Sequence, residues 1–112
     1  MRAIRTTTIS ILAVGLLAQR ESGGHYDRLR GRVVFPIRDR RGRTVGFGGR
    51  AIAAGQEPKY LNTPESPIFR KREALYGLPH ALEPIRRADR VVVVEGYFDC
   101  IALHRAGVGE AV

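Results

Sequence analysis

Cysteine is almost absent from this 112-residue sequence, which contains only Cys100. A single cysteine excludes an intrachain disulfide and a cysteine-based zinc site, and its apolar surroundings predict a small buried side chain. Long apolar runs are missing too. The stretch at residues 9–18 is too short to cross a bilayer, and no signal-peptide cleavage site follows it. We therefore expect no membrane partner, a reducing cytoplasmic compartment, and a short core helix or strand in this stretch.

Lysine is nearly as scarce, because Lys59 and Lys71 are the only lysines among 19 basic residues. Against 11 acidic residues these give a net charge of +8. Such an excess favours polyanionic partners, either nucleic acid or an acidic membrane surface. Arginine suits bidentate contact with phosphate. The alternative is a genome whose base composition favours arginine codons.

The first two thirds of the chain predict a β-rich subdomain. Residues 32–39 and 44–52 have strand composition, and the turn at 39–43 joins them into a β-hairpin. Three glycines within the second strand indicate a bulge or a close backbone approach. The flanking segments 20–32 and 53–69 are predicted to be loops, the second long enough to suggest a function.

The last third predicts the start of an α/β unit. Residues 70–88 favour a short helix and a second helix that starts near Pro79 or Pro84. Residues 89–95 form an apolar run typical of a strand buried on both faces of a parallel sheet. Residues 97–107 favour a helix that Gly107 ends. One parallel strand cannot make a sheet, so we expect either a fragment or partner strands from outside the sequence.

Two carboxylates follow the valine run. Ligands of open α/β sheets collect beyond the carboxyl ends of the strands, where Glu95 lies, and Gly96 allows a close turn into the next helix. Asp99 falls in the first turn of that helix, and the residues alone favour a plain helix-start role for it over a functional one. Glutamate is not a preferred cap, and a charge at the edge of an apolar core is costly. We therefore expect Glu95 to have an arginine or a metal ion as its partner.

These residues carry a family resemblance. The stretch "VVVVEGYFDCIAL" resembles the first acidic motif of the Toprim fold, which primases and topoisomerases share. Two upstream blocks, "YDRLRGRVVFPIRDRRGRTVGFGGR" and "EPKYLNTPESPIFRKREALYG", resemble the polymerase core of bacterial, DnaG-type DNA primases. The resemblance covers residues 21–112, whereas residues 1–20 match only weakly.

The resemblance implies a mixed fold, α+β and α/β. A basic subdomain with a β-hairpin would occupy residues 21–83, and the first strand and helix of a truncated Toprim (Rossmann-like) domain would occupy residues 84–112. The implied activity is synthesis of short RNA primers by nucleotidyl transfer with Mg²⁺ or Mn²⁺. The implied partners are a single-stranded DNA template, ribonucleoside triphosphates, the RNA primer and, through a region absent here, the replicative helicase at the nucleoid. Zinc belongs to a family module that is absent too.

The resemblance also assigns roles to residues. Glu95 becomes the catalytic glutamate and a Mg²⁺ ligand, and Asp99 supports it. The family's second acidic motif, an Asp-x-Asp pair, does not occur after Glu95, so the chain alone is predicted to be inactive. Tyr60 could stack on a base or sugar, or pack the loop. The residues implied to bind template and nucleotide are Arg28, Arg30, Arg50, Lys59, Tyr60, Asn62 and Lys71.

Two alternatives stay open at the level of the sequence. Another Toprim protein, such as a topoisomerase or a recombination factor, would share the acidic motif but not the blocks "PKYLNTPES" and "RKREALYG". A non-catalytic, basic nucleic-acid-binding module would bind with strong salt dependence and would have no use for Glu95.

Overall fold

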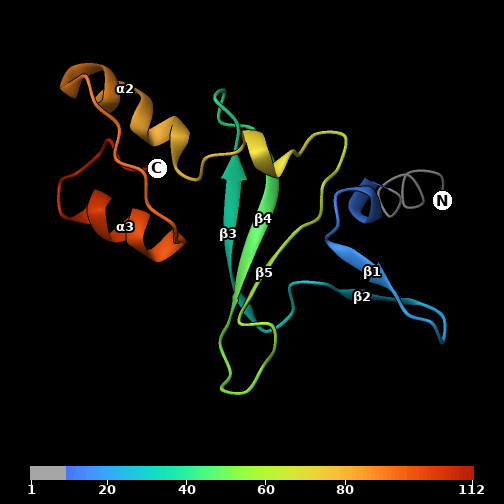
Figure 1. Ribbon diagram of the computed structural model, residues 1–112. Helices are drawn as coiled ribbons and strands as arrows, with labels where there is room; N and C mark the ends of the chain where they lie inside the picture. The colour runs from blue at the N-terminus through green and yellow to red at the C-terminus, as the bar shows by residue number, and fades with distance from the viewer. Residues whose placement is uncertain (1–9) are drawn as a thin grey trace. The chain divides into compact units, whose positions relative to one another are not determined.

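The computed structural model describes residues 10–112, which form two compact units (Figure 1). The first contains the described residues up to Pro36 together with Val45–Arg72, and the second contains Ile37–Thr44 and Glu73–Val112. The predicted domain boundary at residue 84 stays a prediction. No helix within residues 10–112 combines the length and apolar character needed to span a bilayer.

A two-stranded ribbon lies near the start of the first unit. Residues 10–13 are helical, and the strands β1 (Leu17–Gln19) and β2 (His25–Asp27) pair antiparallel with Ala18 opposite Tyr26 (Figure 1). The loop prediction for 20–32 is therefore wrong over β2. Three residues are too few to show a strand periodicity, so only the pairing reveals this strand.

A three-stranded sheet with the order β3–β4–β5 forms the centre of the first unit. Its strands are β3 (Arg32–Arg38), β4 (Thr44–Ala51) and β5 (Tyr60–Asn62). The predicted hairpin is confirmed: Asp39 closes its turn, because its carboxylate accepts hydrogen bonds from the backbone N–H groups of Arg41 and Arg43. The short strand β5 was not predicted, because it lies within the proline-containing segment assigned to a loop.

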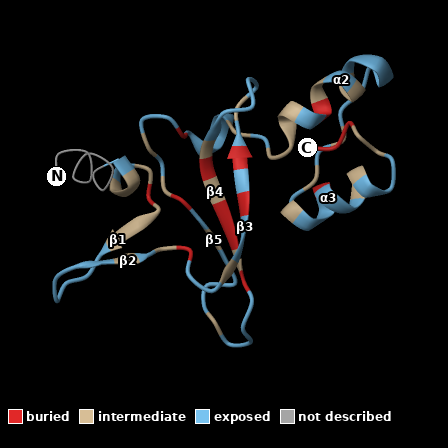
Figure 2. Ribbon diagram, turned by 180° about the vertical axis from the view of Figure 1, so that it is seen from behind, coloured by how far each residue is buried: buried red, intermediate tan, exposed pale blue. Residues whose placement is uncertain are grey.

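The glycines of β4 permit close packing on both faces of the sheet. A Cβ at Gly46 would lie 2.9 Å from the ring of Phe69, and one at Gly49 would lie 2.9 Å from Arg32 and 3.1 Å from Leu29. The predicted close approach is thus confirmed at these positions. Leu29 and Phe69 are buried, and Figure 2 shows the buried positions concentrated along β3 and β4.

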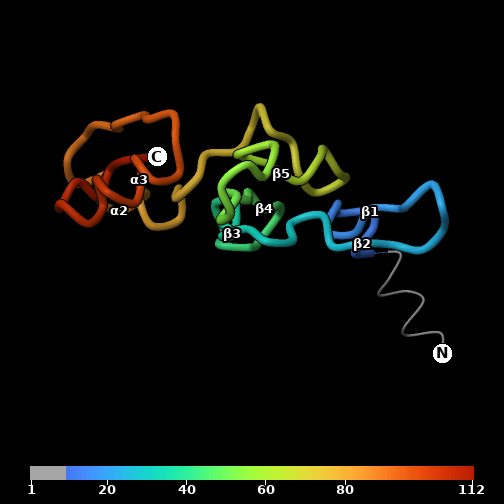
Figure 3. Tube along the Cα trace, turned by 90° about the horizontal axis from the view of Figure 1, so that it is seen from below, coloured from blue at the N-terminus to red at the C-terminus, as the bar shows by residue number. Residues whose placement is uncertain are grey.

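The second unit is mainly helical. A 3₁₀ turn, η1 (Lys71–Glu73), crosses from the first unit into the second, and α2 (Leu78–Ala88) and α3 (Tyr97–Arg105) follow. Figure 3 traces both helices and the C-terminal segment. Helix α2 starts next to Pro79, which was one of the two predicted starts. Pro84, the other predicted start, lies inside the helix. Helix α3 ends before Gly107, as predicted.

The valine run differs from its prediction. Within the described residues it forms no regular strand, but a parallel bridge between Val92 and Ala111 with three backbone hydrogen bonds of 2.9–3.0 Å. Val91 is 51% exposed and Val93 68% exposed. The expectation of burial on both faces is therefore wrong for this structure. The run has one short neighbour, residues 110–112, and only the side bearing Val92 and Val94 is partly covered.

Candidate functional site

One face of the β4–β5 pair brings together three of the predicted binding residues. Arg50 lies directly opposite Tyr60, and Gly48 lies opposite Asn62. Because partners in an antiparallel pair point to the same side, Arg50, Tyr60 and Asn62 share one face, with Gly48 leaving backbone there. Tyr60 is 47% exposed, and its side chain is therefore accessible rather than buried in the loop.

The loop between β4 and β5 is anchored at its base. The Ala51 N–H donates to the Lys59 carbonyl at 2.8 Å, and the Arg32 guanidinium donates to the same carbonyl at 3.3 Å. The Gln56 side-chain amide donates to the Arg30 carbonyl at 3.1 Å. These bonds hold the backbones of Lys59 and Arg30 in place. Sequence reasoning missed Arg32 and Gln56, because their partners are 17 to 27 residues away along the chain.

The remaining cations of the first unit differ in how freely they are presented. Arg30 and Lys71 are exposed, and the Lys71 N–H donates to Glu65 at 2.8 Å. Arg50 is half-buried, and its guanidinium donates to the Ala51 carbonyl at 2.8 Å. Arg28 is also half-buried, and its Nε has no hydrogen-bond partner among residues 10–112. Arg28 and Arg50 are thus both less accessible than Arg30.

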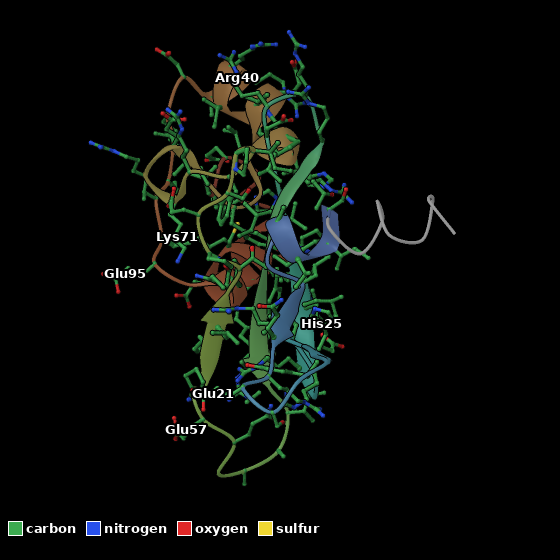
Figure 4. All side chains as sticks on the ribbon, turned by 90° about the vertical axis from the view of Figure 1, so that its right-hand side faces the viewer. Glu21, His25, Arg40, Glu57, Lys71 and Glu95 are labelled. Atoms are coloured by element: carbon green, nitrogen blue, oxygen red, sulfur yellow. The ribbon has the colours of Figure 1, made fainter. Side chains whose placement is uncertain are left out.

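The carboxylates lie where the second unit passes from the valine run into α3. Gly96 is the N-cap of α3, and Asp99 is in its first turn, as predicted. A Cβ at Gly96 would lie 3.0 Å from Asp99 Oδ2, so the Asp99 carboxylate folds back over the helix start. Glu95 is exposed and projects outward (Figure 4). The prediction of a partner assumed that the Glu95 carboxylate is desolvated at the edge of an apolar core. Because Glu95 is exposed to solvent, that reason for a partner does not apply.

Contacts within the second unit fix the start of α3. The rings of Tyr76 and Tyr97 meet edge to face with their centroids 4.8 Å apart. Burial raises the pKa of Tyr97, and the electrostatic influence of the neighbouring Tyr76 hydroxyl raises it further. A Cβ at Gly77 would lie 3.1 Å from the Cys100 sulfur. The block around Tyr76 and Gly77 therefore holds the segment that carries Glu95 and Asp99, a link that the sequence did not reveal.

The residues present fit part of a magnesium site. Carboxylate oxygens are the ligands Mg²⁺ prefers, and Mg²⁺ is commonly held by one or two carboxylates together with substrate phosphates. Glu95 and Asp99 supply two such groups near one helix start. Within residues 10–112 there is no group of three or more His, Cys, Asp or Glu side chains able to hold a metal ion.

Comparison with known proteins places these features in a family. Residues 1–82 match the family model of the DNA primase catalytic core, N-terminal domain. The DNA primase of Synechococcus elongatus is 54% identical over 99 residues, which are 88% of this chain and 14% of that protein. A crystal structure of a DNA primase domain from Pseudomonas aeruginosa is similar with a TM-score of 0.87 and 48% identity, over 95% of this chain and 33% of that one.

A DnaG primase catalytic domain bound to ssDNA is also similar, with a TM-score of 0.83 and 48% identity over 92% of this chain and 33% of that domain. The chain belongs to the family of bacterial DNA primases, and its mixed helices and strands are those of the primase catalytic core. It spans about a seventh of the length of the Synechococcus relative.

Proposed function

We propose that this chain contributes to a primase core that makes short RNA primers on a single-stranded DNA template. The observation that carries the proposal is the family match over residues 1–82, together with relatives that extend it across the acidic motif. The same match favours a primase over a topoisomerase or a recombination factor, the first alternative.

The first unit supplies groups suited to template and nucleotide. Arg50 and Asn62 present a cation and an amide on the face that also carries the exposed ring of Tyr60. Arginine and lysine contact phosphates, and an exposed aromatic ring stacks on bases without sequence preference. A solved relative is a primase catalytic domain bound to ssDNA, which supports a nucleic-acid partner for the proposed primase core. Arg28, Arg30, Lys59 and Lys71 extend the proposed binding set.

The second unit supplies acidic groups for the chemistry. Glu95 and Asp99 would hold Mg²⁺, or Mn²⁺, with an Asp-x-Asp pair expected from outside this sequence. When bound, the metal orients the attacking 3′-hydroxyl and neutralises charge on the leaving pyrophosphate. The chain's own part is to keep Glu95 hydrated and accessible at the start of α3, which the Tyr76–Tyr97 contact holds in place.

Replacing Glu95 with glutamine tests the catalytic role. In a polymerase-competent protein that contains this sequence, Glu95→Gln should lower primer synthesis by roughly a hundredfold or more, as loss of a transition-state group does. Binding of single-stranded DNA should change little, because a carboxylate contributes nothing to phosphate contact. The readouts are incorporation of labelled ribonucleotides and fluorescence anisotropy of a labelled oligonucleotide.

Glu83→Gln is the matched control, because Glu83 is an exposed carboxylate of the same unit whose nearest cation, Arg86, is 3.9 Å away. It changes the net charge equally and should leave synthesis intact. Equal synthesis by both variants would instead favour the second alternative, a basic binding module that has no use for Glu95.

The wider assignments belong to the same proposal. Ribonucleoside triphosphates and the RNA primer are the proposed ligands besides the template, and a replicative helicase is the proposed protein partner. We propose a cytoplasmic protein associated with the nucleoid, since a net charge of +8 favours nucleic acid.

A further inference from the structure

The β1–β2 ribbon carries two arginines gathered on one tyrosine ring. The guanidinium carbon of Arg30 lies 4.6 Å from the centroid of the Tyr26 ring, and that of Arg20 lies 5.7 Å from it. Both distances are within the range of cation–π attraction. We propose that this cluster of Arg20, Tyr26 and Arg30 binds the phosphate backbone of a single-stranded nucleic acid, with Tyr26 positioning both arginines.

The strand register explains how Arg20 reaches the ring. Ala18 lies directly opposite Tyr26, and its small side chain leaves the ring uncovered from that strand. Arg20 follows two residues later, so it points to the same side of the ribbon as Ala18. A larger residue at position 18 would occupy the space that the Arg20 side chain needs to cross to the ring.

A compact turn brings Arg30 to the same ring. The Asp27 carboxylate accepts a hydrogen bond from the Leu29 N–H at 3.0 Å, and the Arg30 N–H is 3.4 Å from the Asp27 carbonyl. The Gln56 amide holds the Arg30 carbonyl from the other side. The backbone of Arg30 is thus fixed. The Asp27 carboxylate therefore stabilises the turn and does not pair with either arginine of the cluster.

Neither guanidinium is neutralised by a carboxylate in the described part of the chain. Within residues 10–112, the side chains of Arg20 and Arg30 form no ion pair with a carboxylate. Contact with a ring leaves guanidinium N–H groups available, and these match phosphate oxygens bidentately. Holding the side chains on the ring also reduces the rotamer entropy lost on binding. The cluster therefore presents two charges of fixed position to a phosphate backbone.

The nature of the polyanion rests on the proposed function, in which the template is a single DNA strand. Arg30 is already in the proposed binding set, whereas Arg20 and Tyr26 extend that set along the ribbon. Because the arginines cover the Tyr26 ring, the ring is not free to stack on a base. The cluster should therefore contact phosphates and not bases. Binding through it should therefore be independent of sequence and sensitive to salt.

The test is binding of the 112-residue chain to a labelled oligothymidylate, measured by fluorescence anisotropy across a series of salt concentrations. Arg20→Gln should weaken binding roughly threefold and lower the slope of log affinity against log salt by about 0.7, the value for one phosphate contact on a single strand. Tyr26→Leu should weaken binding by about as much with no change in net charge, whereas Tyr26→Phe should bind like the parent chain because the ring remains.

The control is Arg43→Gln, which removes one positive charge from an arginine already paired with Asp39 at 2.8 Å. Circular dichroism of every variant checks that the fold is retained. Equal effects of Arg20→Gln and Arg43→Gln, or parental binding by Tyr26→Leu, would overturn the proposal. The choice of partner would be overturned if the chain bound a DNA duplex more tightly than the single strand and the variants weakened duplex binding in the same way. Primer synthesis that still depends on Glu95 would then show that only the ribbon proposal has failed.

Discussion

At the scale of single residues, the protein uses small or buried groups to place charged ones. Gly46 and Gly49 let Phe69 and Leu29 pack against the sheet that carries Arg50. Gly77 lets Cys100 of α3 approach the segment ahead of α2. This contact helps to hold α3, the helix that carries Asp99. Each of these contacts limits where a charged neighbour can be.

Glu110 links one buried carboxylate to stability. Its side chain is 8% exposed, and its Oε1 accepts a hydrogen bond from Arg90 Nε at 2.7 Å. A hydrogen bond from its own backbone amide, followed by that from Arg90, holds the pKa of Glu110 below its ordinary value. A lowered folded-state pKa gives stability that is present above the unfolded-state pKa and is lost as the pH falls through the folded-state pKa.

We therefore expect the free energy of unfolding to fall as the pH drops below about 4, near the ordinary pKa of a glutamate. In Glu110→Gln this part of the decline should be missing, while the part due to Asp39 remains, because hydrogen bonds from Arg43 and Arg41 outweigh burial and lower the pKa of Asp39. Urea unfolding at several pH values measures both curves. Parallel curves for the two proteins would contradict the role of Glu110.

At the scale of elements, patterns within one segment were predictable and pairings between segments were not. The β3–β4 hairpin and α3 follow from composition, turn residues and a terminal glycine. Strands β1, β2 and β5 have three residues each and exist through their partners. The same limit applies to the site: the sequence named Arg50, Tyr60 and Asn62, but only the β4–β5 register shows that they share a face.

The end of α3 is an element whose sequence signal and structure agree in detail. Gly107 has φ 94°, its N–H donates to the His104 carbonyl at 3.1 Å, and the Val108 N–H donates to the Leu103 carbonyl at 2.8 Å. This is the Schellman arrangement, in which glycine avoids the strain of a left-handed conformation. No heavy atom lies within 4 Å of a Cβ built at Gly107, so a side chain there meets no steric obstacle.

Gly107→Ala should therefore destabilise the protein by about 1 kcal/mol through backbone strain alone. Gly107→Asn should cost less, because asparagine tolerates the left-handed region better than alanine. Thermal or urea unfolding of the two variants provides the measurement. An alanine variant as stable as the asparagine variant would be inconsistent with a strain-based cost.

At the scale of the whole molecule, the predicted binding cations and the site carboxylates lie in different units. The chain carries a net charge of +8, its predicted binding cations lie in the first unit, and Glu95 and Asp99 lie in the second. The second unit leaves Val91, Val93, Phe98 and Ile101 exposed. Its two site carboxylates are fewer than the acidic groups expected for the complete metal site of the family.

The isolated 112-residue chain should accordingly make no primers. Incubated with single-stranded DNA, ribonucleoside triphosphates and Mg²⁺, it should incorporate no label above background, while binding the DNA in a salt-dependent way. A longer protein that contains this sequence and the Asp-x-Asp pair provides the positive control. Primer synthesis by the isolated chain would show that Glu95 and Asp99 suffice as the acidic groups.

The sequence by itself determined the family, the hairpin, the helix that stops before Gly107, and the order of the basic blocks and the acidic motif. These depend on neighbouring residues, whose spacing is visible in one dimension. Tertiary structure alone decided that Tyr26 gathers Arg20 and Arg30, that Arg32 and Gln56 anchor the loop before β5, and that one side of the valine run is exposed. Each of these depends on contacts between distant segments, and burial of an apolar strand depends on which neighbours cover it.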